Sequence, residues 1–122
     1  MAHEPGDLGH RGEDATARWL TSRGWSVLDH RWRDASGELD LVCLDPGGAL
    51  VGVEVKARST GRAGLGAESL TPRRVRRLRS AIVAYAGRHG ARVAEARLDL
   101  VELTRVRPGC WRLRHLKRID GW

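Results

Sequence analysis

The hydrophobic positions of the chain change their spacing several times, and these changes divide the sequence into predicted elements. From His10 to about Arg23 the apolar residues recur at helical spacing, and Gly24 is suited to end a helix. Three strand-like runs follow, at about residues 25–33, 38–44 and 49–58. Because the connections between them are too short for parallel crossovers, these three strands are predicted to form an antiparallel meander.

A second helix is predicted after a glycine-rich stretch at residues 59–70, which we expect to form a loop. Thr71 can cap this helix with its hydroxyl, and Pro72 fits the first helical position, where a backbone N–H is not needed. The helix is expected to continue to about Arg88. Its apolar stripe consists of Val75, Leu78, Ile82, Tyr85 and Ala86.

Two further strands are predicted, at about residues 92–104 and 111–119, and the last of them alternates apolar with basic residues. The order helix, three strands, helix, strand and C-terminal edge strand predicts an α/β fold with a mixed sheet flanked by helices. A chain of 122 residues fits one domain. We expect residues 1–9 to form a flexible N-terminal arm and residues 10–122 to form that domain.

The composition adds two expectations about where the protein acts. The start of the chain lacks the apolar core of a signal peptide, and no apolar run approaches the roughly 20 residues that a membrane span needs. We therefore expect a cytoplasmic protein without a membrane partner. The net charge is +7, which is expected to attract polyanions such as nucleic acid. The alternative is that these charges form only a solvated surface.

Acidic residues interrupt two neighbouring predicted strands that are otherwise apolar. Asp40 lies within the second strand, and Glu54 and Lys56 lie within the third. Side chains alternate between the two faces of a strand, so Glu54 and Lys56 are predicted to share one face. If the two strands pair as a hairpin, Asp40 comes beside Glu54. Half-buried carboxylates repel each other unless a cation compensates them.

A hard divalent cation is the compensation that this group of residues favours. Mg²⁺ or Mn²⁺ prefers oxygen ligands, and Asp40, Glu54 and the backbone carbonyl of Val55 would supply three. Lys56 would then lie next to the metal, where its ammonium can orient or activate a water molecule. The alternative is a solvated sheet face on which these acids pair with a cross-strand lysine.

Glu13 is an acid on the face of the first predicted helix that we expect to look inward. At about 100° per residue it shares that face with Ala17 and Leu20. Glu13 is therefore a candidate for an inward-facing functional group. The alternative is a helix-start acid that interacts favourably with the helix dipole.

The second predicted helix carries an unusual concentration of arginines in its first turns. Negative charge is preferred at this end of a helix, so tolerating the arginines suggests that they have a use, most simply in contacting the phosphates of DNA. The candidates for nucleic-acid binding are Arg73, Arg74, Arg76 and Arg77. Arg74 lies at the border of the apolar stripe and is the best placed to reach the acidic site. The alternative is a solubilising face whose arginine stems cover apolar surface.

Three motifs occur in a fixed order along the chain. They are residues 12–20 (Gly-Glu-Asp-Ala-Thr-Ala-Arg-Trp-Leu), residues 33–41 (Arg-Asp-Ala-Ser-Gly-Glu-Leu-Asp-Leu) and residues 51–58 (Val-Gly-Val-Glu-Val-Lys-Ala-Arg). This pattern resembles the YraN family, a bacterial family assigned to the PD-(D/E)XK nuclease superfamily, near archaeal Holliday junction resolvases. The similarity continues through residues 71–78 and 97–101, so it covers nearly the whole chain.

The resemblance implies a restriction-endonuclease-like fold and a Mg²⁺-dependent endonuclease site. It implies that Asp40 and Glu54 bind the metal, that Lys56 serves catalysis and that Glu13 completes the site. The implied substrate is DNA, in branched, single-stranded or processed form, and the relatives that act on junctions imply a homodimer. Leu39 stands where the superfamily has a proline, and Arg74 stands where relatives often carry lysine. The alternative function is a non-catalytic nucleic-acid-binding module in DNA repair, recombination or uptake.

Overall fold

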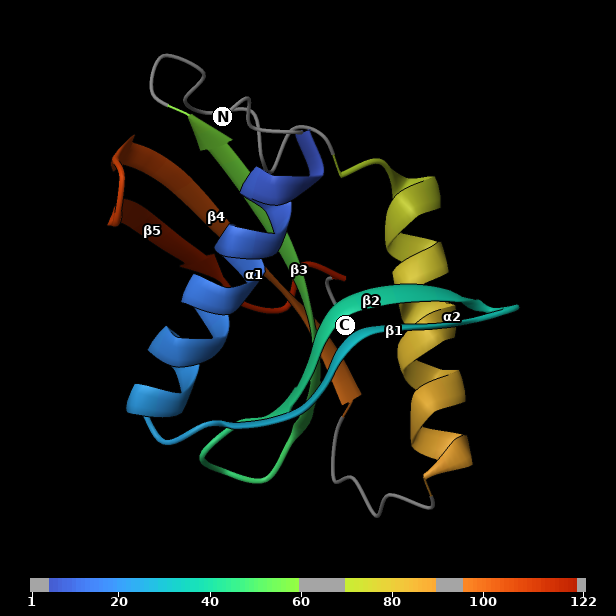
Figure 1. Cartoon of the computed structure of the whole chain (residues 1–122). Helices are drawn as coiled ribbons and strands as arrows, with labels where there is room; N and C mark the ends of the chain where they lie inside the picture. Colours follow the sequence, from blue (N-terminus) through green and yellow to red (C-terminus); the bar gives the residue numbers. More distant parts are fainter. Residues whose placement is uncertain (1–4, 60–69, 90–95, 121–122) are drawn as a thin grey trace.

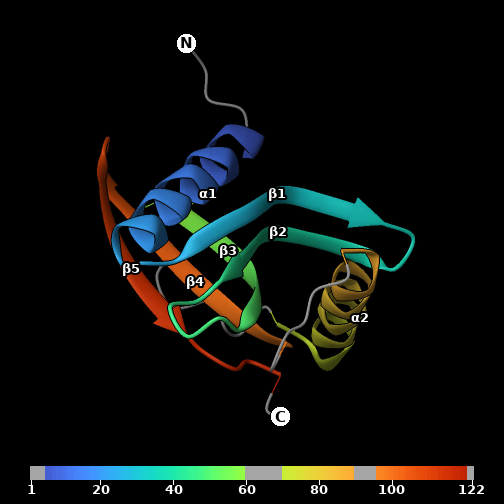
Figure 2. The ribbon, with the colours of Figure 1, turned by 90° about the horizontal axis from the view of Figure 1, so that it is seen from below.

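Five strands form one sheet in the order β1-β2-β3-β4-β5, with a helix on each face (Figures 1 and 2). The computed structural model describes residues 5–59, 70–89 and 96–120. The elements in chain order are α1 (Pro5–Ser22), β1 (Ser26–Asp34), β2 (Gly37–Leu44), β3 (Leu50–Ser59), α2 (Pro72–Arg88), β4 (Ala96–Arg107) and β5 (Cys110–Leu116). The predicted α/β class and the predicted order of elements are confirmed.

The pairing of the strands makes the sheet mixed. Strands β1, β2 and β3 form the predicted antiparallel meander. Strand β4 runs parallel to β3, because α2 lies in the crossover that connects them, and β5 returns antiparallel to β4. The sheet therefore ends in β1 on one side and in β5 on the other.

Each helix covers a separate apolar core on its own face of the sheet. Alternate residues of β3 divide between the two cores: Val51, Val53 and Val55 pack in the α1 layer, and Leu50 packs in the α2 layer. The predicted apolar stripe of α2 contributes Leu78, Ile82 and Tyr85 as buried residues, together with Ala81, and Val75 and Ala86 lie partly buried beside them. Figure 2 shows α1 and α2 on opposite sides of the sheet.

The first helix begins earlier than the sequence pattern predicted. It starts at Pro5, so residues 5–9 of the expected N-terminal arm are helical, and residues 1–4 lie outside the described residues. Proline needs no backbone N–H at the first position of a helix. Packing of the later turns onto the sheet holds the helix, and the low helix propensity of Gly6 and Gly9 does not stop its extension.

The second helix begins where it was predicted, with Thr71 as its N-cap accepting a hydrogen bond from the amide of Arg74. Only the ends of the glycine-rich stretch 59–70 and the later part of the predicted strand 92–104 fall within the described residues. Neither α1 nor α2, the two helices in the described part of the chain, is long and apolar enough to cross a membrane.

A candidate metal centre between β2 and β3

The predicted site forms at the point where β2 and β3 stop pairing. The last paired residues are Leu41 and Val53, and beyond them the two strands separate. Beyond this point a side chain replaces the hydrogen bonding between the strands: Oδ2 of Asp40 accepts a hydrogen bond from the amide of Val55 at 2.8 Å. Asp40 is thereby fixed in the opening between the strands, beside the face that carries Glu54.

The environment of Asp40 is acidic and partly desolvated. Burial is the main reason that the pKa of Asp40 is raised to about 8, and the charge of Glu54 raises it further. The hydrogen bond from Val55 opposes this rise, while the charge of Glu13 adds to it. Glu13, on α1, therefore lies close enough to the pair to act on it, as the inward helical face predicted.

Glu54 is almost fully buried, with 2% of its surface exposed, and it is held by two cations. Arg74 donates from Nε and Nη2 to Oε2 at 3.1 and 3.0 Å, and from Nη2 to Oε1 at 3.3 Å. Lys56 Nζ lies 3.6 Å from Oε2, on the same face of β3 as predicted from strand alternation. Part of the Lys56 side chain is exposed, so its ammonium lies between the buried acid and solvent.

Glu13 reaches the site because α1 lies very close to β3. A Cβ placed on Gly12 would lie 2.7 Å from Cβ of Ala57, so only glycine permits this approach. Glu13 follows directly and is buried, with Oε1 accepting from Nη1 of Arg31 at 2.8 Å. Arg31 belongs to β1 and has a positive φ of 48°.

Two of the three acids of the site are paired with cationic side chains. Lys56 and Arg74 both pair with Glu54, and Arg31 pairs with Glu13. Asp40 accepts its hydrogen bond from the amide of Val55. Among the described residues no three His, Cys, Asp or Glu side chains are grouped closely enough to hold a metal ion by themselves. An ion at this place would have to be held by Asp40, Glu54 and a backbone carbonyl such as that of Val55, which are the oxygen donors that Mg²⁺ and Mn²⁺ prefer. Glu13 fits the more distant position of an acid that acts through water.

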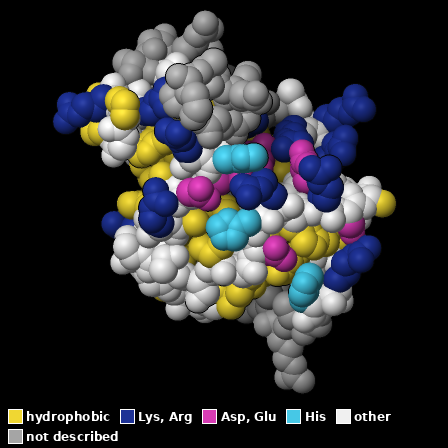
Figure 3. All heavy atoms as spheres, in the orientation of Figure 1, with side chains coloured by type: hydrophobic (Ala, Val, Ile, Leu, Met, Phe, Trp, Pro, Cys, Tyr) yellow, Lys and Arg dark blue, Asp and Glu magenta, His cyan; other side chains and the backbone are white. Residues whose placement is uncertain are grey.

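The four arginines predicted to bind nucleic acid separate into two groups. Arg74 turns inward to Glu54, whereas Arg73, Arg76 and Arg77 are exposed on α2. Figure 3 shows Lys and Arg side chains over the N-terminal half of α2 and again near the tip of the β4–β5 hairpin. The surface thus carries basic groups on both sides of the face in view.

Sequence reasoning predicted that Arg74 reaches the site, which is confirmed, but it did not predict the bidentate geometry of that contact or the contact of Arg31. The pairing of Arg74 with both oxygens of Glu54 depends on where α2 lies on the sheet, and only the border position of Arg74 pointed toward it. Arg31 gave no signal, because its contact with Glu13 joins residues on α1 and β1 and leaves no trace in the apolar pattern.

A second buried charged cluster lies outside the site, around Asp99 on β4. Its carboxylate accepts from Nε and Nη2 of Arg97, from the amide of Arg118, and bonds Nε2 of His115 at 2.8 Å. Burial alone would raise the pKa of Asp99, but the hydrogen bonds from His115, Arg97 and Arg118 outweigh it and lower that pKa. Asp99 joins β4, β5 and the segment after β5.

Comparisons with known proteins agree with the sequence motifs. The sequence model of a family described as "Uncharacterised protein family UPF0102" matches residues 12–103. A UPF0102 protein of Beutenbergia cavernae is 39% identical over 92% of this chain and 94% of its own length. A UPF0102 protein of Renibacterium salmoninarum is 40% identical over 93% of this chain and 95% of its own length. A UPF0102 protein of Anaeromyxobacter dehalogenans is 41% identical over 80% of this chain and 72% of its own length.

Proposed function

This chain belongs to the uncharacterised protein family UPF0102, the YraN family that its motifs resemble, and we propose that it is a metal-dependent nuclease that hydrolyses DNA phosphodiester bonds. Its substrates would be branched or otherwise processed DNA. The observation that carries the proposal is the convergence of Asp40, Glu54 and Lys56 where β2 and β3 separate.

We infer a role for each residue of the site from its burial and its partners. Asp40, Glu54 and the carbonyl of Val55 would hold Mg²⁺ or Mn²⁺, and Glu13 would hold a water linked to it. When bound, such an ion polarises a phosphoryl oxygen and lowers the pKa of a coordinated water. The raised pKa of Asp40 beside the buried carboxylate of Glu54 favours this reading, because a divalent cation would remove the repulsion between the two charges.

Lys56 is suited to handle the attacking water and the charge of the phosphate. Its Nζ lies beside Glu54 yet remains partly exposed, so a phosphodiester arriving from solvent meets it directly. An ammonium in this position orients a water for attack and balances the negative charge that develops on the phosphate oxygens. The exposed arginines of α2 (Arg73, Arg76 and Arg77) would contact the DNA backbone next to it.

A nicking assay tests this function. Supercoiled, single-stranded and four-way-junction DNA are incubated with the protein in Mg²⁺, in Mn²⁺ and in chelator. We expect metal-dependent cleavage that falls by about 10²-fold or more in Asp40→Asn and in Lys56→Met, because each loses charge stabilisation at the reacting phosphate. Glu38→Gln, an exposed acid of the same strand as Asp40, is the matched control. Cleavage that is unchanged in Asp40→Asn or Lys56→Met would defeat the proposal.

A non-catalytic nucleic-acid-binding module is the second candidate, and the ion pairs of the site favour it. Arg74 and Lys56 neutralise Glu54, and Arg31 neutralises Glu13, so these two acids are compensated without a metal. This reading predicts salt-sensitive DNA binding without turnover. It also predicts that Asp40→Asn leaves DNA binding unchanged and that Mn²⁺ does not bind, which isothermal titration calorimetry measures.

A further inference from the structure

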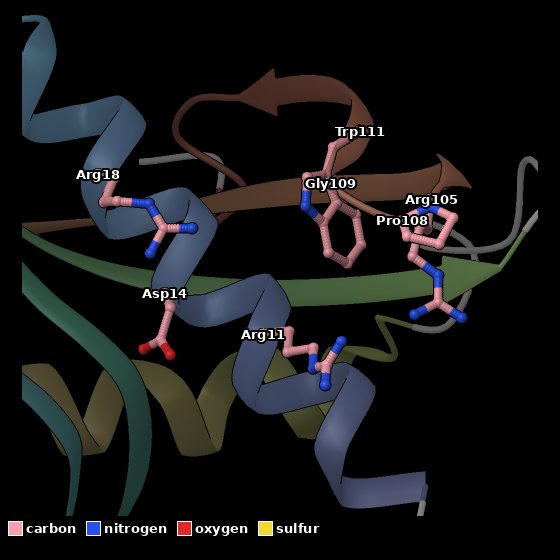
Figure 4. Close-up of a pocket in the computed structure, with 7 residues that line it drawn as sticks. All are labelled: Arg11, Asp14, Arg18, Arg105, Pro108, Gly109 and Trp111. Atoms are coloured by element: carbon pink, nitrogen blue, oxygen red, sulfur yellow. The ribbon is translucent and has the colours of Figure 1, made fainter. Parts of the chain in front are cut away.

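A groove of about 250 Å³ opens between α1 and the β4–β5 hairpin, away from the carboxylates (Figure 4). Helix α1 contributes Arg11, Asp14 and Arg18, and the hairpin contributes Arg105, Trp111 and its turn. At about 100° per residue, the α1 groups lie roughly 100–160° around the helix from Glu13. The groove and the candidate metal centre therefore lie on opposite flanks of α1.

The fold itself brings the aromatic and basic groups of this groove together. Arg105 and Trp111 are direct partners across β4 and β5, so their side chains are neighbours. Arg11 and Arg18 lie two helical turns apart on one face, about 10 Å along the axis at 1.5 Å per residue. Figure 4 shows the Trp111 indole extending from β5 toward α1, with Arg18 on one side, Arg105 on the other and Arg11 below it in this view.

The indole of Trp111 favours a flat ligand, and the arginines of the groove favour a negatively charged one. Among the described residues that line the groove, there are three guanidinium groups and one carboxylate, that of Asp14, so this lining is positive overall. Part of Trp111 packs against the α1 core, and the remainder lines the groove. A simple anion would make no use of the indole, and an aromatic peptide side chain would make no use of the arginines.

We propose that this groove binds an unpaired nucleotide of a single-stranded nucleic acid, with its base stacked on Trp111 and its phosphates beside Arg11, Arg18 and Arg105. Base–aromatic stacking next to arginines is the way in which proteins hold single strands without reading their sequence. A duplex does not fit, because its bases stack on each other. The proposal takes its ligand class from the proposed function, and it narrows the substrate to DNA that contains a single-stranded segment.

Binding of a short labelled oligodeoxythymidine, measured by fluorescence anisotropy in chelator, tests the groove independently of the metal centre. Trp111→Leu keeps an apolar contact with the core but removes the stacking surface. We expect it to weaken binding about 5- to 150-fold, the range that corresponds to stacking of one base, and Trp111→Phe to lose less. Binding of a blunt duplex should change little in Trp111→Leu.

Charge variants provide a second test that does not disturb the core. Arg18→Gln should weaken oligodeoxythymidine binding, and the matched control Arg112→Gln should weaken it less, because exposed Arg112 is not part of the groove lining. Asp14→Asn should tighten binding, since it removes a negative charge from the described part of the lining. A purely structural role for these residues would not produce an increase in affinity.

The proposal is overturned if folded Trp111→Leu binds the oligonucleotide like the wild type, or if Arg18→Gln and Arg112→Gln behave alike. Equal affinity for free thymidine monophosphate and for the oligonucleotide would also overturn it, because the groove would then hold a small molecule. If the binding differences persist without any metal-dependent cleavage, the nuclease proposal fails and the groove stands. If metal-dependent cleavage is observed but Trp111→Leu has no effect on binding, only the proposal for the groove fails, and the nuclease proposal stands.

Discussion

Arg74 on α2 donates to both carboxylate oxygens of Glu54 on β3, at 3.1 and 3.0 Å to one oxygen and 3.3 Å to the other. A bidentate guanidinium neutralises the carboxylate and also occupies the oxygens that a metal ion would use. The helix that carries the exposed arginines is thus tied by one ion pair to the strand that carries the candidate ligand. Metal affinity and the position of α2 should therefore be linked.

Removing the Arg74 cation should increase the stabilisation that Mn²⁺ provides. In Arg74→Gln the buried Glu54 keeps Lys56 as its one cationic partner among the described residues, so we expect the metal-free protein to lose about 1–3 kcal/mol of unfolding free energy. Mn²⁺ should restore part of this loss, so that its effect on Tm exceeds that in the wild type. Thermal unfolding with and without Mn²⁺ measures both quantities.

The neighbouring Arg73→Gln is the matched control for Arg74→Gln, because it removes the same charge from an exposed position of the same helix. It should change the unfolding free energy by no more than about 0.5 kcal/mol. Equal Mn²⁺-induced shifts of Tm in wild type, Arg74→Gln and Arg73→Gln would contradict a link between Arg74 and the metal centre.

Replacing Gly12 by alanine should destabilise the protein, because α1 and β3 approach too closely to accommodate a methyl group. In Gly12→Ala the new Cβ would lie 2.7 Å from Cβ of Ala57, so the helix must shift. Overpacking of this kind costs about 1–3 kcal/mol, which exceeds the gain of up to about 1 kcal/mol in helix propensity. Urea denaturation should therefore show that Gly12→Ala is less stable than the wild type.

Two further variants separate the clash from the helix propensity. Gly9→Ala makes the same substitution in the same helix with nothing within 4 Å of the new Cβ, so it should not be destabilised. The double variant Gly12→Ala with Ala57→Gly should recover part of the stability lost in Gly12→Ala. A Gly12→Ala protein as stable as Gly9→Ala would show that α1 adjusts at no cost.

The parts of the fold that sequence predicted are those fixed by local rules. The shared face of Glu54 and Lys56 follows from the alternation of side chains along one strand, and the start of α2 follows from Thr71 and Pro72. These features need only short stretches of chain, so single residues are sufficient to indicate them.

The parts that sequence did not predict depend on contacts between distant elements. The start of α1 at Pro5 is one example, because the sheet that anchors the helix is absent from a local pattern rich in glycine. The contact of Arg31 with Glu13 and the bidentate geometry of Arg74 on Glu54 are another, although the position of Arg74 at the border of the apolar stripe did predict that it reaches the site. Their pairing depends on the orientation of whole elements, which no spacing in the chain encodes.

Asp99 should stabilise the protein at neutral pH and lose this effect in acid. Its pKa is lowered in the folded state, so the stabilisation is complete above the unfolded pKa of about 3.9 and disappears as the pH falls through the lower folded value. Asp99→Asn leaves the buried Arg97 with Asp45 as its remaining acidic partner, which should cost about 3 kcal/mol at neutral pH. Urea denaturation over a pH series measures the difference.

The difference in unfolding free energy between wild type and Asp99→Asn should shrink as the pH is lowered below about 4. Asp14→Asn, at an exposed position, is the control and should differ from the wild type by no more than about 0.5 kcal/mol at neutral pH. A difference for Asp99→Asn that stays constant into acid would mean that its carboxylate charge contributes nothing.

Asp40 should show the opposite pH dependence when no metal is present. Burial and the charge of Glu54 raise its pKa to about 8, so the folded state holds a proton that the unfolded state has lost. The resulting stabilisation is complete below the unfolded pKa of about 3.9 and is lost as the pH rises through about 8. In chelator, the wild type should therefore lose stability as the pH rises from about 4 to about 8, and Asp40→Asn should lose less because it has no carboxyl proton to release over this range.

A divalent cation should reverse this loss if Asp40 and Glu54 hold it. The cation takes the place of the proton, so Mn²⁺ should stabilise the wild type more at about pH 8.5 than at about pH 6.5. Asp40→Asn lacks the titrating carboxylate, so its smaller response to Mn²⁺ should not increase in the same way. Measured by thermal unfolding, a Mn²⁺ effect that is equal at both pH values in the wild type would mean that the ion binds elsewhere. The raised pKa of Asp40 would then reflect burial among acids that serve no metal.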